Sequence, residues 1–325
     1  MSRTELTDQD AATQLAKELG NLPLALEQVG AYMDKTRSSP SRYLPLYRSR
    51  RKLLQRGTSL TGKIAVLATI WDISLQQIRK SSPAAADLMK LLAFFAPEGI
   101  PLEDIRRRAN LLPKPLAAVI EDQKAFEEAV QTLTRYSMVR VRGNSFLSVH
   151  RSVQTVVRAR MGEYERKKWA KAAVRVMADA LPAECDDWRT WPVCSMLLPH
   201  AKDAMRHAKE LQVAPEATGR LLNNLGMYSL GRAEFGEAKT AFEQALAIDK
   251  AAYGKDDPKV ARDLTNLGFL QKNQGELEKA RKHFEAALRI SESVYGADHP
   301  EVATSLNNLG LVLRDQAQQK KNELN

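Results

Sequence analysis

Apolar side chains recur every three or four residues along most of the chain, which is the spacing of one face of an α-helix. The pattern changes once, over residues 138–149, where two short apolar runs flank a Gly143-Asn144 turn. Such a pair of runs around a turn dipeptide is typical of a β-hairpin. The sequence therefore predicts a mainly α-helical protein with one small β-element.

In the first 215 residues the same spacing predicts a series of helices, over residues 11–19, 23–36, 64–78, 84–95, 102–109, 126–136 and 151–161. Residues 38–57 are basic and contain tyrosine, and we expect them to be a connector. The helices that precede the hairpin, together with the hairpin itself, describe a winged-helix module. The expected organisation is a helical segment and linker, a winged-helix-like domain, a helical connector and a terminal array, at residues 1–60, 61–162, 163–215 and 216–325.

The terminal array is repetitive. Asn224-Leu225-Gly226 recurs as Asn266-Leu267-Gly268 and as Asn308-Leu309-Gly310, 42 residues apart each time. Each unit has the pattern of a helical hairpin, and a single hairpin cannot bury its own apolar face, so neighbouring units must stack. After Asp315 the third unit runs into a Gln- and Lys-rich segment. We expect two full repeats followed by one unpaired helix.

These units resemble tetratricopeptide repeats (TPRs) of the 42-residue kind found in kinesin light chains. A glycine follows the leucine of each first helix, and an Ala-x-x-x-Phe-x-x-Ala pattern marks the second helix, at residues 238–245 and 280–287. The resemblance implies an α-α superhelix in which the first helices line a concave face.

Positions on that face are predicted to bind a partner peptide. Residues at i, i+4, i+7 and i+11 share one helical side, and they are Arg220, Asn224, Met227, Arg262, Asn266, Phe269, Asn273, Asn308 and Leu311. An asparagine amide can both donate to and accept from a peptide backbone, while arginine attracts acidic groups. Alternatively, the asparagines bond between adjacent helices and hold the stack together. The two roles are compatible.

A second resemblance concerns residues 10–215. Gly20-Asn21-Leu22-Pro23-Leu24-Ala25-Leu26 is similar to the GLPLAL segment of NB-ARC proteins, the signal-transducing STAND ATPases, with one Asn inserted. Residues 68–75 and 146–154 are similar to the winged-helix region that follows this segment in bacterial members. The resemblance implies ARC-like helices before the winged helix, and it implies ADP or ATP as the cofactor of a complete relative.

Two residues of this chain correspond to nucleotide contacts in that family. The resemblance places Pro23 on the adenine side of the nucleotide and His150, the histidine of an MHD-like motif, at the β-phosphate of ADP. Arg151 departs from the motif, which prefers Asp there. Both contacts would require an ATPase core to be supplied.

The residues that such a core requires are not predicted in this chain. Only 19 residues precede Gly20, too few for a strand, a phosphate-binding loop and magnesium ligands. Residues 57–63 fit the spacing of a phosphate-binding loop, but Ile64 replaces the Ser or Thr that binds magnesium, and a basic segment precedes the loop instead of a strand. We expect no ATP hydrolysis, no catalytic residues and no cofactor in this chain alone.

Charge supports a second functional class. The net charge is +10, and the excess lies before residue 219, with 34 basic against 24 acidic residues, whereas the rest has 15 of each. A winged helix can bind nucleic acid through a basic surface, for which the candidates are Arg106, Arg107, Arg108, Arg140, Arg142, Arg151, Arg158 and Arg160. In STAND proteins this module mostly packs within the switch, so protein recognition is the favoured prediction.

Other sites are less well supported. Cys185, Cys194, His200 and His207 fit no zinc spacing, and Cys194 lies on an apolar helix face, so we predict no metal site. The two cysteines, the lack of a signal-peptide pattern and the lack of a long apolar run predict a cytoplasmic location without a membrane span. The sequence thus favours a sensor or adaptor of STAND-type signalling that binds a protein or peptide through its TPR groove, with self-association left open.

Overall fold

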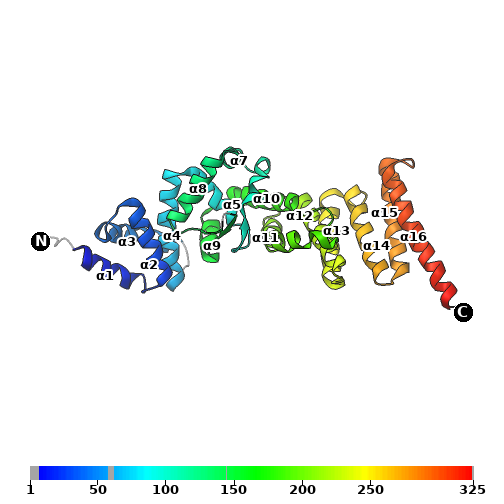
Figure 1. The fold of residues 1–325 in the computed structure, drawn as a ribbon, viewed down its shortest axis with the longest axis horizontal. Helices are drawn as coiled ribbons and strands as arrows, with labels where there is room; N and C mark the ends of the chain where they lie inside the picture. The colour runs from blue at the N-terminus through cyan, green and yellow to red at the C-terminus, as the bar shows by residue number, and fades with distance from the viewer. Residues whose placement is uncertain (1–6, 58–61, 144, 324–325) are drawn as a thin grey trace. The chain divides into compact units, whose positions relative to one another are not determined.

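The computed structural model describes residues 7–57, 62–143 and 145–323 and confirms the mainly α-helical fold (Figure 1). The chain forms two compact units, Met1–Val176 and Met177–Asn325. No helix within the described ranges is both long and apolar enough to span a membrane.

The first unit is built from short helices: α1 (Asp8–Glu18), α2 (Pro23–Thr36), α3 (Pro40–Gly57), α4 (Gly62–Ser81), α5 (Pro83–Leu92), α6 (Leu102–Arg106), the 3-10 helix η1 (Ala109–Leu111), α7 (Lys114–Glu121), α8 (Gln123–Arg135) and α9 (Arg151–Arg160). Local sequence explains several of their ends. Pro23 occupies the first turn of α2, and Arg37 ends this helix in the left-handed conformation. Asp122 caps α8 by accepting from the backbone N–H of Ala125.

The prediction of a connector over residues 38–57 was wrong, because this segment forms helix α3. Tyr43, Leu44 and Tyr47 are buried on one side of the helix. The many arginines and the internal Pro45 hid this narrow apolar face in the sequence. Helix α3 packs against both α1 and α4 and therefore belongs to the core of the first unit.

The predicted hairpin is present as β2 (Arg140–Arg142) and β3 (Phe146–Ser148), which pair antiparallel with Val141 opposite Leu147. A strand that the sequence analysis missed, β1 (Ile100–Pro101), pairs with the other edge of β3, giving the order β1-β3-β2. Helix α7 was also missed. Helix α10 (Glu163–Ala180) contains the boundary between the two units.

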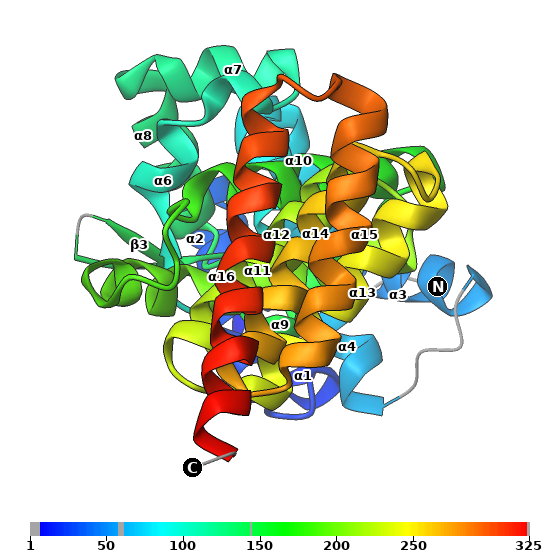
Figure 2. The ribbon, with the colours of Figure 1, turned by 90° about the vertical axis from the view of Figure 1, so that its right-hand side faces the viewer.

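The second unit continues with the 3-10 helix η2 (Trp188–Thr190), α11 (Trp191–Glu210), α12 (Pro215–Gly231), α13 (Phe235–Tyr253), α14 (Pro258–Asn273), α15 (Leu277–Tyr295) and α16 (Pro300–Glu323). From α11 onward each helix packs on the next in a regular α-α array. Figure 2 shows α12, α14 and α16 as one layer of this array and α13 and α15 as the other.

Glycines set how closely the two helices of a repeat approach. A Cβ added at Gly226 would lie 2.3 Å from Phe242 Cε1, and one at Gly268 would lie 2.6 Å from Phe284 Cε1. Both distances are far below van der Waals contact, so only glycine allows each phenylalanine ring to lie against the first helix. The repeated Gly and Phe of the sequence therefore form the same packing contact in both repeats.

The third unit departs from the first two as predicted. Gly275 ends the turn after α14 with φ +76°, and its counterpart 42 residues later is Ala317, which is helical. Helix α16 continues through this position to Glu323 and is 24 residues long, against 16 for α14. Glycine is not required for the turn, since Ala233 takes a φ of +59° at the same position of the first repeat.

Candidate functional site

The residues predicted to bind a peptide lie on α12, α14 and α16, and we call them together the A-helix face. Arg220, Arg262 and Asn273 are exposed, and Asn308 is buried with 7% of its surface accessible. The others are half-buried: Asn224, Met227, Asn266, Phe269 and Leu311. The face thus presents amides, arginine and apolar groups along three parallel elements of one layer.

The three repeated asparagines do not have equivalent surroundings. Asn266 Nδ2 donates to Asn223 Oδ1 at 2.6 Å, which connects α14 to α12. This bond matches the alternative in which asparagine holds the stack together. Asn224 and Asn266 are both half-buried, and Asn308 is the least accessible of the three.

A buried polar network that the sequence analysis missed lies beneath this face. Asp249 on α13 and Asp263 on α14 are both fully buried. Arg262 Nη2 is 2.9 Å from Asp249 Oδ2 and 3.1 Å from Asp263 Oδ1. Asn223 Nδ2 donates to Asp263 Oδ1 at 2.7 Å. The charge of Arg262 is therefore shared with two internal carboxylates. Both arginines of this face are exposed, but Arg220 is not among the residues of this network.

Glycine makes room for this network. A Cβ added at Gly219 would lie 2.6 Å from Asp249 Oδ1. The only sequence signal was an aspartate at a core position, since Asp249 follows Phe242 and Ala245 on the buried side of α13. A buried carboxylate requires compensating partners, but a single sequence does not reveal which residues supply them.

The network makes the stability of the array depend on pH. Burial, reinforced by the Asp263 carboxylate, raises the pKa of Asp249 from 3.8 to about 6, although Arg262 and Lys259 oppose the shift. The unfolded carboxyl loses its proton at lower pH than the folded one, so the stabilising contribution is complete below the unfolded pKa and is lost as the pH rises through about 6. We expect urea unfolding of wild type to require less denaturant at about pH 7.5 than at about pH 5.

Asn is the matched test of this pH dependence, because it keeps the shape and donor capacity of a protonated aspartate. Asp249→Asn should reduce the difference between the two unfolding midpoints. An unchanged difference in this variant would assign the pH dependence to other groups.

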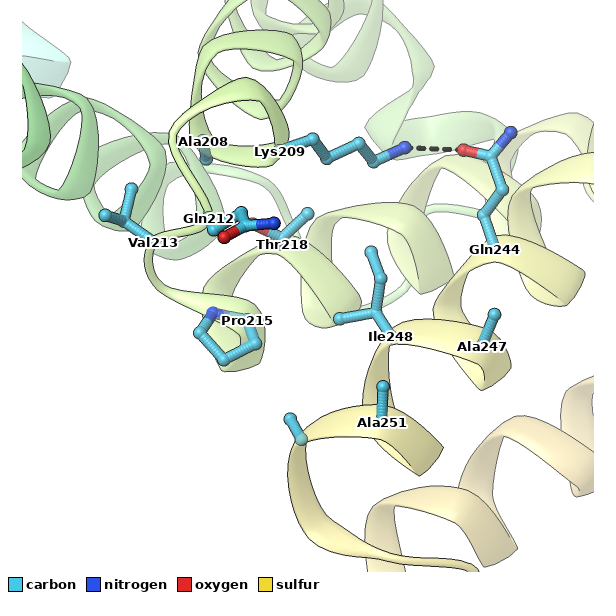
Figure 3. Close-up of a pocket in the computed structure, with 11 residues that line it drawn as sticks. Ala208, Lys209, Gln212, Val213, Pro215, Thr218, Gln244, Ala247, Ile248 and Ala251 are labelled. Atoms are coloured by element: carbon cyan, nitrogen blue, oxygen red, sulfur yellow. Dashed lines mark hydrogen bonds between the residues drawn. The ribbon is translucent and has the colours of Figure 1, made fainter.

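An apolar hollow of about 570 Å³ lies between the end of α11, the start of α12 and one side of α13 (Figure 3). Its walls include Val213, Pro215, Ile248 and Ala251. At its rim Lys209 Nζ donates to Gln244 Oε1 at 2.5 Å. The hollow can accept an apolar group.

In the first unit, a hollow of about 340 Å³ brings the GLPLAL-like segment close to the hairpin. Leu24 of α2 and His150 both line it, together with Arg140, Arg142 and Arg151. Pro23 is exposed at the first turn of α2 and does not line the hollow itself. Glu27 and Glu98 also line the hollow, and Glu27 pairs with Arg140 at 3.3 Å. Arg142 and Arg151 suit the phosphate end of a nucleotide.

His150 also has a structural role. Its Nδ1 accepts from the backbone N–H of Ser152 at 3.2 Å and so caps α9. With Nδ1 accepting, the neutral imidazole has its proton on Nε2, which can act as a donor. The histidine therefore combines the helix-capping role with a donor available to a ligand.

The basic residues of the nucleic-acid alternative are largely engaged within the protein. Their partners are Glu103 for Arg106 and Arg107, Asp104 for Arg108, Glu27 for Arg140, the carbonyl of Ala93 for Arg158 and Asp72 for Arg160. Binding of nucleic acid depends on cations that can neutralise phosphates. Five of these arginines are thus paired with a carboxylate of the protein, and Arg158 donates to a neutral carbonyl.

The cysteines and histidines considered as metal ligands are buried in the second unit. Cys185 and Cys194 are buried with their sulfurs 3.5 Å apart, and burial raises the pKa of the Cys185 thiol. His200 and His207 are buried on α11. Within the described part of the chain, no three potential metal ligands converge.

The sequence that fits a phosphate-binding loop falls mainly on residues 58–61, which lie outside the described residues. The flanking elements are helices α3 and α4. A phosphate-binding loop requires a strand before it.

Comparison with known proteins agrees with the repeat analysis. Residues 218–259 and 264–321 match models described as "Tetratricopeptide repeat", so the resemblance of the array to TPRs is confirmed. Residues 76–166 match a "Domain of unknown function (DUF7779)".

A curated relative from Hyaloscypha variabilis, a "Nucleotide-binding leucine-rich repeat (NLR)-like protein", is 27% identical over 271 residues. The match covers 77% of this chain but 25% of the relative, so the chain spans a quarter of that protein's length. The crystal structure of BtubC (BKLC) from P. vanneervenii is 14% identical, with 81% of this chain and 88% of that chain covered. Its TM-score of 0.38 is too low to bear on fold or function.

Proposed function

We propose that this chain is a protein-recognition module, a sensor or adaptor of STAND-type signalling, whose A-helix face holds an extended segment of a partner. The observation that carries the proposal is the set of polar and apolar side chains presented together by α12, α14 and α16, next to one another in a TPR array. TPR arrays are non-enzymatic scaffolds that form extended binding surfaces.

The contacts within the array divide this face into two kinds of residue. Arg262 and Asn266 bond inside the protein, to the buried aspartates and to Asn223, and we assign them mainly to holding the repeats in register. Arg220 and Asn224 on α12 are the residues that we expect to meet the partner, with Met227 giving apolar contact. The exposed guanidinium of Arg220 favours a partner with an acidic group.

In a complete STAND relative, this recognition would bias a nucleotide switch. We propose that the hollow lined by Leu24 and His150 completes the nucleotide site when an ATPase core is supplied, with Pro23 on the adenine side and His150 donating to a phosphate. Arg142 and Arg151, which line the same hollow, support this role by their charge. The chain alone would recognise its partner without hydrolysing ATP.

The experiment is a selection of displayed random peptides on the full chain, followed by measurement of affinity for synthetic copies. We expect the selected peptides to be acidic. Arg220→Glu should weaken binding by about 1.5–3 kcal/mol, roughly tenfold or more, because it removes a charge-assisted hydrogen bond and adds repulsion. Isothermal titration calorimetry measures this change directly.

Arg289→Glu is the matched control, since Arg289 is an exposed arginine of α15, in the other layer of the array. It makes the same change of net charge and should leave the affinity within about twofold of wild type. Equal losses in the two variants would show that net charge alone governs binding, and this result would contradict the assignment of Arg220.

A further inference from the structure

Helix α16 exposes a continuous apolar stripe. It consists of Ala303, Leu306, Gly310, Leu313 and Ala317, which we call the α16 strip. Their alternating spacing of three and four residues places them along one side of the helix. Leu306 is 50% exposed and Leu313 is 45% exposed, both high values for leucine.

The preceding repeat shows what covers the equivalent positions. Ala261 and Leu264, 42 residues before Ala303 and Leu306, are buried in a cluster with Ala287 and Ile290 of α15. Gly268, 42 residues before Gly310, lies under the ring of Phe284. The corresponding stripe of α14 is thus covered by the next helix.

The first repeat is built in the same way, with Phe242 against Gly226. The two covering helices share the sequence Phe-Glu-x-Ala-Leu-x-Ile, at residues 242–248 and 284–290, with an alanine four residues earlier in each. By contrast, a Cβ added at Gly310 would meet no described atom within 4 Å. Gly226 in α12 and Gly268 in α14 are thus each covered by a phenylalanine ring, whereas the equivalent Gly310 in α16 is not.

We propose that the α16 strip binds an amphipathic helix with the pattern Ala-x-x-x-Phe-x-x-Ala-Leu-x-Ile, and that its phenylalanine ring lies on Gly310. The partner helix would pack on Leu306 as α15 packs on Leu264. Leu313 would extend the apolar contact by one further turn. This surface is distinct from the A-helix face, so the two sites can be tested separately.

The probe is a fluorescein-labelled peptide with the sequence of α15, residues 277–295, titrated with the full chain and followed by fluorescence anisotropy. We expect saturable binding to wild type. Gly310→Leu should weaken it at least about tenfold, because the leucine side chain fills the space that the aromatic ring needs. The same peptide carrying Phe284→Ala should bind wild type with an affinity lower by a similar factor.

Gly236→Leu is the matched control, because Gly236 is also a helical glycine in α13 with nothing within 4 Å of an added Cβ. It should bind the peptide like wild type. Leucine favours helix more than glycine does, so neither substitution should unfold its helix, and circular dichroism checks this.

Failure of wild type to bind the peptide would overturn the proposal, as would equal binding by Gly310→Leu. Light scattering of the full chain tests the competing occupant, a second copy. A dimer that Gly310→Leu dissociates, with no peptide binding, would show that the strip pairs with itself, and this result too would overturn the proposal. These outcomes leave the test of Arg220 unaffected.

Discussion

Phe242→Ala is expected to destabilise the TPR array by about 3–5 kcal/mol, enough to unfold the repeats around it under mild conditions. Phe242 is fully buried in a cluster with Ala238, Leu267 and Leu270. Its ring also lies against Gly226. It therefore joins its own repeat to the next one, and its loss leaves a cavity that rigid helices cannot close.

Urea unfolding of the full chain, followed by circular dichroism, measures this change. Val294→Ala is a suitable control because Val294 is an exposed apolar residue of α15, and it should change the unfolding free energy by no more than about 0.5 kcal/mol. A midpoint for Phe242→Ala as close to wild type as that of Val294→Ala would contradict the packing described for Gly226 and Phe242.

Asp72→Ala is expected to destabilise the first unit by about 2–3 kcal/mol, through loss of a partly buried ion-pair network. Asp72 on α4 is buried and pairs with Arg50 of α3 and, at 3.0 Å, with Arg160 of α9. The substitution leaves two arginines without their shared carboxylate. We place the effect below that of a fully buried pair because both arginines have partial access to water.

Glu27→Ala provides the comparison, since Glu27 pairs with Arg140 at 3.3 Å and both side chains are well exposed. An exposed pair contributes at most about 1 kcal/mol. The measurement is urea unfolding of both variants, monitored by tryptophan fluorescence, to which the buried Trp71 beside Asp72 on α4 contributes. If Asp72→Ala were no more destabilising than Glu27→Ala, the network would not anchor α3.

The repeat array was predictable because its structural rules are local and occur more than once. The 42-residue spacing predicted the paired helices, and the repeated Gly and Phe predicted that the two helices of a repeat pack closely. The length of α16 was not predictable from the residue at this turn position, because Ala233 forms the turn of the first repeat whereas Ala317 is helical.

The first unit was less predictable because its apolar faces are narrow or short, and because some of them are interrupted by residues that are unusual in a buried helix. Arginines and Pro45 masked the buried side of α3, although Tyr43 and Tyr47 lie one turn apart. Strand β1 has two residues, and its pairing with β3 depends on a contact between distant parts of the chain. Neither feature has a periodic pattern long enough to detect.

The helical face that carries the candidate residues was predictable, but the hydrogen bonds of those residues were not. Helical spacing identified the face shared by Asn224 and Asn266, but not that Asn266 donates to Asn223 or that Arg262 bonds two buried aspartates. Those interactions join different helices, so they depend on how the repeats stack. Because Arg262 and Asn266 are engaged in these interactions, we expect Arg220 and Asn224 to contact the ligand.

We assign partner recognition to the A-helix face. Hydrogen–deuterium exchange of the full chain with and without a selected acidic peptide tests this assignment. We expect the peptide to slow exchange in α12 and α14, around Asn224 and Asn266, and to leave exchange on the exposed side of α13 and α15 unchanged. Protection confined to α13 and α15, or to the first unit, would contradict the assignment.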